Sequence, residues 1–325
     1  MTKTIKEYND YVFEVSASTL SKNFFSRNDF LSYQSHVQNK QYLCFQLKTS
    51  SKNKVIFECV FCHKDGETIF FSPITGAFSD IFQGVGLSPC MMKECFTEIE
   101  GYLVSVYGEI KLSITLPPLY FSNSSGVINC LINLGWVIEQ TDVNYHLEIF
   151  DDFELRNSIS SSKRKCLNKL IKNDYEFFEL DINLSNVKDV YNVIAINRTA
   201  LGYPVTMPEV SIIDLSSQFQ NDVKLFCVKK DGLIVASAIC LKINLDTLYV
   251  FYWAELPEDR VESPILKLAD GISDYCEKNK IKFLDVGIST EDSKPNYGLM
   301  NFKKQLGCVE SLKFTLIKET LINAS

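Results

Sequence analysis

Two segments of the chain repeat one another, and this repeat restricts the fold more than any other feature of the sequence. Residues 126–136 read Gly-Val-Ile-Asn-Cys-Leu-Ile-Asn-Leu-Gly-Trp, and residues 298–308 read Gly-Leu-Met-Asn-Phe-Lys-Lys-Gln-Leu-Gly-Cys. Glycine, asparagine, leucine and glycine recur at one constant offset. Each segment follows a long predicted helix and a predicted strand at the same distance, so we interpret the pair as an internal duplication, with chance similarity as the alternative.

The length of the chain fits two domains of similar size. At 325 residues it exceeds what one ordinary hydrophobic core supports, and two domains of about 150 residues each are expected. The duplication puts the linker near Asp151–Asp152. We therefore expect one domain over residues 1–150 and a second over residues 151–325.

Composition and charge narrow the possible functions. Hydrophobic residues make up 46% and charged residues 22% of the chain, which indicates a well-packed globular protein. The net charge of −7 argues against broad capture of DNA, although a local phosphate site stays open. Residues 1–7 lack the apolar stretch of a signal peptide, and no apolar run approaches the ~18 residues of a membrane span. We expect a cytoplasmic protein without a transmembrane segment.

The 11 cysteines are odd in number, scattered and mostly embedded in apolar runs, which favours reduced thiols over a disulfide framework. Residues 59–63 read Cys-Val-Phe-Cys-His and match the c-type haem attachment pattern literally. This motif lies in an apolar run that ends at residues 64–66, and no export signal accompanies it. We interpret it as a plain strand. No Cys/His set has convincing metal spacing, so no metal is expected.

Hydrophobic periodicity predicts a similar order of elements in both halves, with an α/β fold and a mixed sheet in each. In the first half we expect helices at 19–38, 91–107 and 126–134, and strands at 42–48, 54–62, 68–72, 110–116 and 136–150. In the second half we expect helices at 162–173, 187–199, 263–279 and 297–306, and strands at 176–181, 223–229, 233–243, 247–252, 283–287 and 312–317.

This order resembles that of the GNAT acyltransferases, and the resemblance is sharpest over residues 296–308. Many GNAT enzymes carry there an Asn, an apolar residue three positions on, and a closing Gly. Asn296, Leu299 and Gly307 fit those places. Lys303 stands where the general-acid Tyr of the family usually stands.

A lysine at that place resembles the FemAB-like branch, the amino-acid and acyl transferases of bacterial envelope chemistry, which have two GNAT-type domains in one chain. The branch has an Asp-x-Gly strand end, a Gly-Leu pair and a Phe-Lys pair, and this chain has Asp285–Gly287, Gly298–Leu299 and Phe302–Lys303. Arg198 and Gly202–Pro204 resemble its acceptor loop.

The resemblance implies an N-acyltransferase that moves an acyl group from acyl-CoA to an amine, on a sugar or an envelope precursor of polysaccharide type. The helical arm of the peptidoglycan-bridge members is not visible here. Its absence and the acidic net charge favour acyl-CoA over aminoacyl-tRNA, which stays open as an alternative donor. The second alternative is a non-catalytic binding module, because a fold does not fix a function. The first domain is expected to be non-catalytic.

Lys303 stands out in the sequence independently of the resemblance. On a helix, Leu299, Phe302 and Leu306 form one apolar stripe, and Lys303 flanks it. The first copy has Leu131 at the matching position. A lysine there either lies with its stem on apolar surface and its head in water, or directs a cation at a developing oxyanion or a donor phosphate.

Other site residues are predicted around Lys303. Asp285 follows at a strand end as a second catalytic candidate, and Glu255 and His146 are open alternatives for the general base. We assign the donor to Tyr252, Ser263 and Asn296, and the acceptor to Arg164, Arg198 and Tyr203. We also expect the main cleft to be lined by some of Arg198, Tyr203, Tyr252, Asp285 and Asn296.

Two of these assignments compete with structural roles. Ser263 is expected to cap a helix that opens with Pro264, where backbone N–H groups could also hold a donor phosphate. Arg164 belongs to a basic run on the helix 162–173. That run is either a solvated helix face or a phosphate clamp, and Arg164 is the residue that can offer a bidentate fork.

Overall fold

The computed structural model describes residues 2–8, 10–121 and 124–320, and the chain divides into two compact units. The first unit holds residues 1–143, 292–294 and 311–325, and the second holds residues 144–291 and 295–310. The expected ranges of 1–150 and 151–325 stay a prediction. The two units differ from these expected ranges chiefly because most of the C-terminal strand belongs to the first unit.

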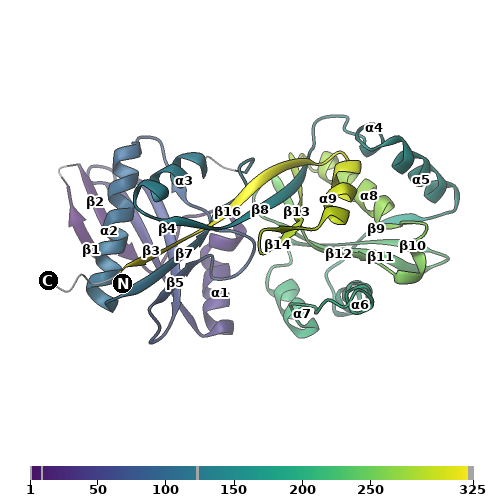
Figure 1. Ribbon diagram of the computed structural model, residues 1–325. Coiled ribbons are helices and arrows are strands. Elements are labelled where there is room, and N and C mark those ends of the chain that lie inside the picture. The colour runs from purple at the N-terminus through teal and green to yellow at the C-terminus, as the bar shows by residue number, and fades with distance from the viewer. Residues whose placement is uncertain (1, 9, 122–123, 321–325) are drawn as a thin grey trace. The chain divides into compact units, whose positions relative to one another are not determined.

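The first unit is a mixed sheet covered by helices (Figure 1). Its strand order is β1-β2-β3-β4-β5-β7-β16, antiparallel except for the parallel pair of β5 and β7. The strands are β1 (Lys3–Glu7), β2 (Tyr11–Ser16), β3 (Lys40–Thr49), β4 (Val55–Lys64), β5 (Ile69–Ser72), β7 (Ile110–Thr115) and β16 (Val309–Thr320), and β6 (Phe82–Gln83) pairs with β4. The helices are α1 (Asn28–Gln38), α2 (Pro89–Tyr107) and α3 (Ser124–Asn133).

The second unit is a mixed sheet with the order β8-β13-β12-β11-β10-β9, in which only the pair of β12 and β13 is parallel. Figure 1 shows α6 and α7 on one face of this sheet and α5, α8 and α9 on the other. The strands are β8 (Val137–Glu148), of which residues 144–148 lie in this unit, β9 (Glu176–Leu180), β10 (Val223–Lys230), β11 (Leu233–Lys242), β12 (Thr247–Glu255) and β13 (Phe283–Ile288). The helices are α4 (Leu155–Ser158), α5 (Ser161–Lys172), α6 (Leu184–Ala200), α7 (Glu209–Gln218), α8 (Ile265–Lys278) and α9 (Tyr297–Gln305). A short ladder of β14 (Thr290–Glu291) and β15 (Lys294–Pro295) follows β13.

The two repeated segments form the same local structure. Each is a helix, α3 or α9, that ends before a glycine with positive φ, 85° at Gly135 and 79° at Gly307. The N–H of Trp136 donates to the carbonyl of Leu131 at 3.0 Å, and the N–H of Cys308 donates to the carbonyl of Lys303 at 3.1 Å. This is the glycine-terminated helix end in which the chain turns back over its last turn. Like elements therefore occupy both copies, as the duplication predicts.

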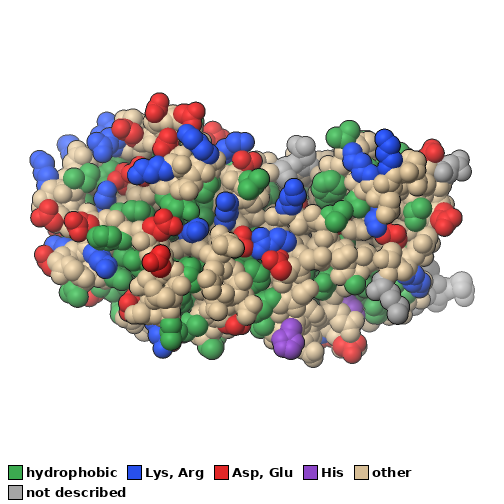
Figure 2. Space-filling model, turned by 180° about the vertical axis from the view of Figure 1, so that it is seen from behind, with side chains coloured by type: hydrophobic (Ala, Val, Ile, Leu, Met, Phe, Trp, Pro, Cys, Tyr) green, Lys and Arg blue, Asp and Glu red, His purple; other side chains and the backbone are tan. Residues whose placement is uncertain are grey.

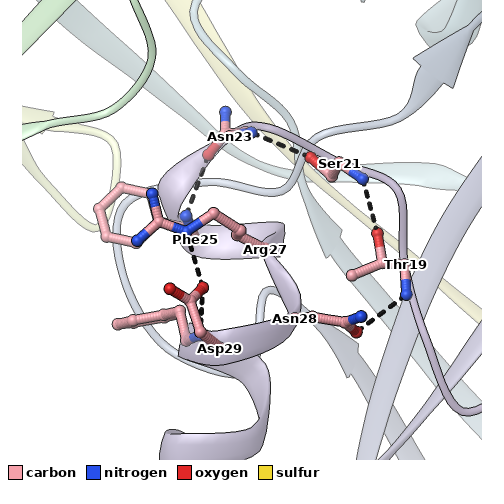
Figure 3. Close-up of polar contacts among 8 residues, drawn as sticks. Thr19, Ser21, Asn23, Phe25, Arg27, Asn28 and Asp29 are labelled. Carbon is pink, nitrogen blue, oxygen red and sulfur yellow. Dashed lines mark hydrogen bonds and ion pairs between the residues drawn. The ribbon is translucent and has the colours of Figure 1, made fainter. Parts of the chain in front are cut away.

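The segment at 19–27 is not α-helical, contrary to the sequence prediction, and contains only a short 3₁₀ helix, η1 (Phe24–Ser26). Thr19, Ser21 and Asn23 each accept, through a side-chain oxygen, the backbone N–H two residues further on (Figure 3). Such local bonds give the backbone an alternative to helical pairing. The helix α1 accordingly begins only at Asn28.

Further elements that were not expected from the sequence include β1, β2 and α7. The haem-like motif, by contrast, lies within β4, and its Cys59, Cys62 and His63 are buried, which confirms the strand prediction.

Candidate active site

The side chain of Lys303 lies inside the second unit. It is 1% exposed, and of the predicted apolar stripe only Leu306 is buried as deeply, whereas Leu299 and Phe302 are half-buried. Lys303 thus faces inward and does not merely flank the buried face of α9, which corrects the expected orientation. The counterpart Leu131 is fully buried in α3. A position filled by leucine in one copy is filled by a buried ammonium in the other.

The Lys303 ammonium is bound to the end of β13. Its Nζ donates to the carbonyl oxygen of Gly287 at 2.9 Å and to that of Ile288 at 2.8 Å. It also lies 5.6 Å from the centre of the Tyr145 ring. Burial lowers the pKa of Lys303 to about 8, and the carboxylate of Asp285 opposes this shift. The ammonium has three hydrogens, so two are used by carbonyls and one is left for another acceptor.

Asp285 lies close to Lys303 and is 1% exposed. Its carboxylate accepts the side-chain amide of Asn144 at 3.0 and 3.1 Å and the backbone N–H of Gly287 at 2.7 Å. Gly287 has φ of 74°, a conformation that favours glycine. The Asp-x-Gly pattern is therefore a carboxylate that fixes a left-handed turn, and this turn presents its carbonyl groups to Lys303.

The strands part next to this pair. The parallel pairing of β12 with β13 joins residues 247–249 to residues 283–285 and ends there. In β12 the register with β11 shifts between Tyr252 and Val250, so Phe251 is an extra, bulged residue. Bulges of this kind re-aim side chains and interrupt pairing beside active sites. The backbone of β12 beyond Tyr249 is thus not paired with β13.

The acceptor residues are partly brought together. The Arg198 guanidinium lies 5.8 Å from the centre of the Tyr252 ring. The Tyr252 hydroxyl is hydrogen-bonded to the Thr206 hydroxyl at 2.5 Å, and this bond ties the loop after α6 to β12. Tyr203 is 45% exposed, and its N–H donates to the carbonyl of Arg198 at 3.0 Å, at the end of α6.

The donor residues have local structural roles. Asn296 caps α9, because its side-chain oxygen accepts the N–H of Leu299 at 3.0 Å. Ser263 does not cap α8 as expected: it has φ of 59°, and the cap position is Pro264. The carboxylate of Glu255 instead accepts the N–H of Ile265 at 3.1 Å, and burial raises the pKa of Glu255.

Arg164 lies apart from these residues, on α5. Its guanidinium donates to the carbonyl of Arg156 at 2.8 Å and to that of Ile159 at 3.4 Å, at the end of α4. The neighbouring Lys163 reaches toward α9, where its ammonium lies 5.1 Å from the centre of the Phe302 ring. Figure 2 shows acidic and basic side chains intermixed over one face of the molecule.

A cavity of 560 Å³ lies in the second unit, but none of the five predicted cleft residues lines it. It is bounded by α5, β9 and α8. Among the described residues, no group of three His, Cys, Asp or Glu side chains is placed to hold a metal ion. Within the same ranges no helix is both long and apolar enough to cross a membrane.

Three features of the site were missed from the sequence. His146, one of the alternatives named for the general base, is the register partner of Asp285, and burial lowers its pKa. Asn144 and Tyr145, which were not named, contact the pair from β8. These residues come from a distant strand, and no local pattern marks them.

The third missed feature could have been found from the repeat. At the offset that relates Leu131 to Lys303, Asp285 corresponds to Ser113 in β7. Ser113 is paired with Phe71 across the parallel strands as Asp285 is paired with Tyr249. Both charges of the buried pair are thus replaced by neutral residues in the first copy.

The comparisons with known proteins concern the fold. No model of a known family matches the sequence, and no curated protein matches it. Among solved structures, FemX has a TM-score of 0.69 and 13% identity, covering 91% of this chain and 92% of its own. The tandem GNAT protein from the clavulanic acid biosynthesis pathway has a TM-score of 0.54 and 10% identity, covering 86% and 83%. L-PGS from Bacillus licheniformis has a TM-score of 0.54 and 11% identity, covering 91% and 88%. The chain therefore has the tandem GNAT-type, FemAB-like α/β fold that the sequence predicted.

Proposed function

We propose that the chain is an N-acyltransferase of the cytoplasm that moves an acyl group from acyl-CoA to an amine, on a sugar or a precursor of the bacterial cell envelope. The fold it shares with FemX, with L-PGS and with a tandem GNAT protein described in relation to AcCoA supports acyl or aminoacyl transfer. The observation that carries the proposal is the buried Lys303 ammonium beside the parting of β12 and β13. The second domain holds this feature, and the first domain has leucine in its place.

The reaction needs charge stabilisation where Lys303 lies. The amine nitrogen attacks the thioester carbonyl carbon, a C–N bond forms, and the carbonyl electrons move onto oxygen. The C–S bond then breaks and the thiolate leaves, and the proton that the attacking nitrogen gives up ends on this thiolate as the free thiol. An ammonium hydrogen not used by Gly287 or Ile288 stabilises the oxyanion or the leaving thiolate. Holding the amine and the carbonyl together supplies most of the remaining rate enhancement.

Asp285 acts in this proposal by keeping Lys303 charged. Its carboxylate raises the pKa of Lys303 against the effect of burial. It also fixes the Gly287 turn through the N–H of that residue. With a folded-state pKa of about 8, Lys303 is mostly protonated at neutral pH.

The two substrates would approach from different elements. The acceptor would contact Arg198 and Tyr203 at the end of α6, where Tyr252 holds the neighbouring loop through Thr206. The donor would lie along the part of β12 that β13 does not pair with, between Tyr252 and the start of α9 at Asn296.

One observation favours aminoacyl-tRNA as the alternative donor. A helix N-terminus usually offers free N–H groups to a phosphate, but at α8 the carboxylate of Glu255 already accepts the first N–H. Acidic residues Glu258, Asp259 and Glu262 precede the helix. A pyrophosphate at Ser263 would meet this negative charge, whereas the exposed Lys165 and Lys172 of α5 would suit a nucleic-acid backbone.

The proposal is tested by presenting both donors to the purified chain. Thermal unfolding is followed with acetyl-CoA, free CoA and aminoacyl-tRNA, and transfer to UDP-linked amino sugars is followed by mass spectrometry. The proposal is supported if acetyl-CoA stabilises the chain against unfolding and if acylated product forms only when both the donor and the acceptor are present. Stabilisation and transfer with aminoacyl-tRNA alone support the alternative donor. If neither donor stabilises the chain or is consumed, the transferase proposal is wrong and a binding module remains.

A further inference from the structure

The cavity in the second unit lies apart from Lys303 and from the other residues of the candidate active site. The cavity of 560 Å³ has the size of a small-molecule site. It shares no lining residue with the candidate active site. It opens between the end of α5, the edge strand β9 and the helix α8.

The charge of the cavity is strongly one-sided. Four carboxylates line it, those of Asp174, Glu176, Glu179 and Asp274. Among the described residues none of them forms an ion pair or a side-chain hydrogen bond. Two lysines also line the cavity, Lys278 and Lys267, of which Lys267 is paired with Asp270 at 2.9 Å. Arg156 and Lys230 add positive charge at its margin, beside Asp274 and Tyr175 respectively. The four carboxylates of the lining still outnumber its two ammonium groups.

The pKa values of two lining groups are raised, chiefly by burial. Burial raises the pKa of Asp274, and the neighbouring Asp270 raises it further. Burial and then Glu179 raise the pKa of Tyr275 to about 12. Each shift disfavours additional negative charge, so a cation entering the cavity would relieve both groups.

Aromatic rings form the apolar part of the lining. Phe177 packs directly on Gly271 of α8, where even a methyl group would meet its ring carbons at 2.2 Å. Phe226 holds two lining rings, stacking on Phe177 at 5.6 Å and meeting Tyr275 edge to face at 5.0 Å. Tyr175 also lines the cavity, is 3% exposed, and has a buried hydroxyl without a hydrogen-bond partner among the described residues. Rings of this kind bind ammonium groups and the methylenes between them.

Among the described residues, the carboxylates of the lining do not form a metal site. Within the described residues no three acidic, His or Cys side chains converge as metal ligands do. Four carboxylates against two lysine ammonium groups instead match an extended organic cation with several charges. We propose that this cavity binds an aliphatic polyamine, with ammonium groups at the carboxylates and methylenes on the rings. This site is independent of the proposed acyl transfer.

The test is calorimetric titration of spermidine into the full-length chain at pH 7 and 0.15 M salt, without any acyl donor. We expect one saturable site, with Asp274→Asn weakening the affinity at least about tenfold. Glu179→Gln, on the exposed edge strand, is the second variant and should weaken binding in the same direction. Glu277→Gln removes a charge from the same helix outside the cavity and should change the affinity less than about twofold.

Three results would overturn the proposal. Spermidine could give no saturable binding at this salt concentration. Asp274→Asn and Glu277→Gln could weaken binding equally, which would indicate a diffuse counterion effect. Equimolar Mg²⁺ could displace spermidine, which would indicate a site for a metal ion. Thermal unfolding of each variant is recorded together with the titration. It shows that any loss of affinity is measured on a folded chain.

Discussion

At the scale of single residues, the repeat was more informative than the helical pattern. Comparing Lys303 with Leu131 predicted a lysine in a core position, and the structure buries both. The pattern of the helix alone placed Lys303 at the margin of the apolar face. Its inward direction depends on the carbonyls of Gly287 and Ile288, which come from another strand. Helical periodicity cannot show such a contact.

We predict that Lys303→Met lowers turnover by about 10²–10³, the scale seen when one oxyanion donor is removed. The methionine keeps the apolar stem but leaves the carbonyls of Gly287 and Ile288 without this donor, which costs about 1–3 kcal/mol of unfolding free energy. The matched control is Lys304→Met, since Lys304 is the exposed neighbour, paired with Glu310 at 3.0 Å. Steady-state kinetics check the prediction, and equal losses in both variants would contradict a specific role for Lys303.

The lowered pKa of Lys303 also predicts how stability depends on pH. The folded-state value of about 8 lies below the ordinary value of 10.5. Between these values the unfolded chain binds more protons, so the wild type gains stability as pH rises from 8 to 10.5. The gain relative to Lys303→Met should approach about 3 kcal/mol. Urea unfolding of both proteins at pH 7 and pH 10.5 measures it, and a constant difference would show that the ammonium is not desolvated.

At the scale of elements, long periodic segments were predicted well and irregular ones were not. Helices α2, α5, α8 and α9 lie within a few residues of their predicted bounds. The prediction of a helix in the loop before α1 was wrong because polar side chains form local hydrogen bonds with the backbone there. Hydrophobic spacing does not reveal such bonds. Among the site residues, the prediction that Ser263 caps α8 was wrong for a related reason. Its helix is capped by the carboxylate of Glu255, a partner from β12 that the sequence does not mark.

The packing of Phe177 on α8 predicts an unusual response to a helix-favouring substitution. Gly→Ala inside a helix ordinarily stabilises by up to about 1 kcal/mol. At Gly271 the added methyl would overlap the Phe177 ring at 2.2 Å, and overpacking costs about 1–3 kcal/mol. We expect Gly271→Ala to destabilise the chain. Gly101→Ala in α2, where nothing lies within 4 Å, should stabilise it. Thermal unfolding of both variants measures the two changes in stability, and changes of the same sign would refute the packing argument.

At the scale of the whole molecule, the first unit is completed by a strand that the order of the sequence would assign to the second. Residues 311–320 of β16 follow the last helix of the second unit but belong to the first, where they pair with β7. Leu316 is fully buried in the core of the first unit. The sequence predicted the two halves and the strand, but not this exchange, because both arrangements present the same run of alternating apolar residues.

The exchange predicts which unit responds to a change near the C-terminus. Leu316→Ala should cost about 2–5 kcal/mol, and the loss should appear in the first unit. The chain has two tryptophans, Trp136 in the first unit and Trp253 in the second. Their fluorescence in single-tryptophan variants follows each unit during urea unfolding. We expect a larger shift at Trp136 than at Trp253, with the half-exposed Leu312→Ala as control. A larger shift at Trp253 would refute the assignment of β16.

The place of β16 has a consequence for how the protein is made. A ribosome synthesises the β1–β7 part of the first sheet long before it reaches residues 311–320. Until then the edge of β7 that pairs with β16 stays unpaired, and Leu112 and Ile114 of this strand are not yet covered by it. Unpaired edges of this kind readily join other chains, and pairing across so long a stretch of sequence is slow. Newborn chains of this protein are therefore vulnerable to aggregation during translation, and a chaperone that shields the β7 edge would raise the yield of folded protein.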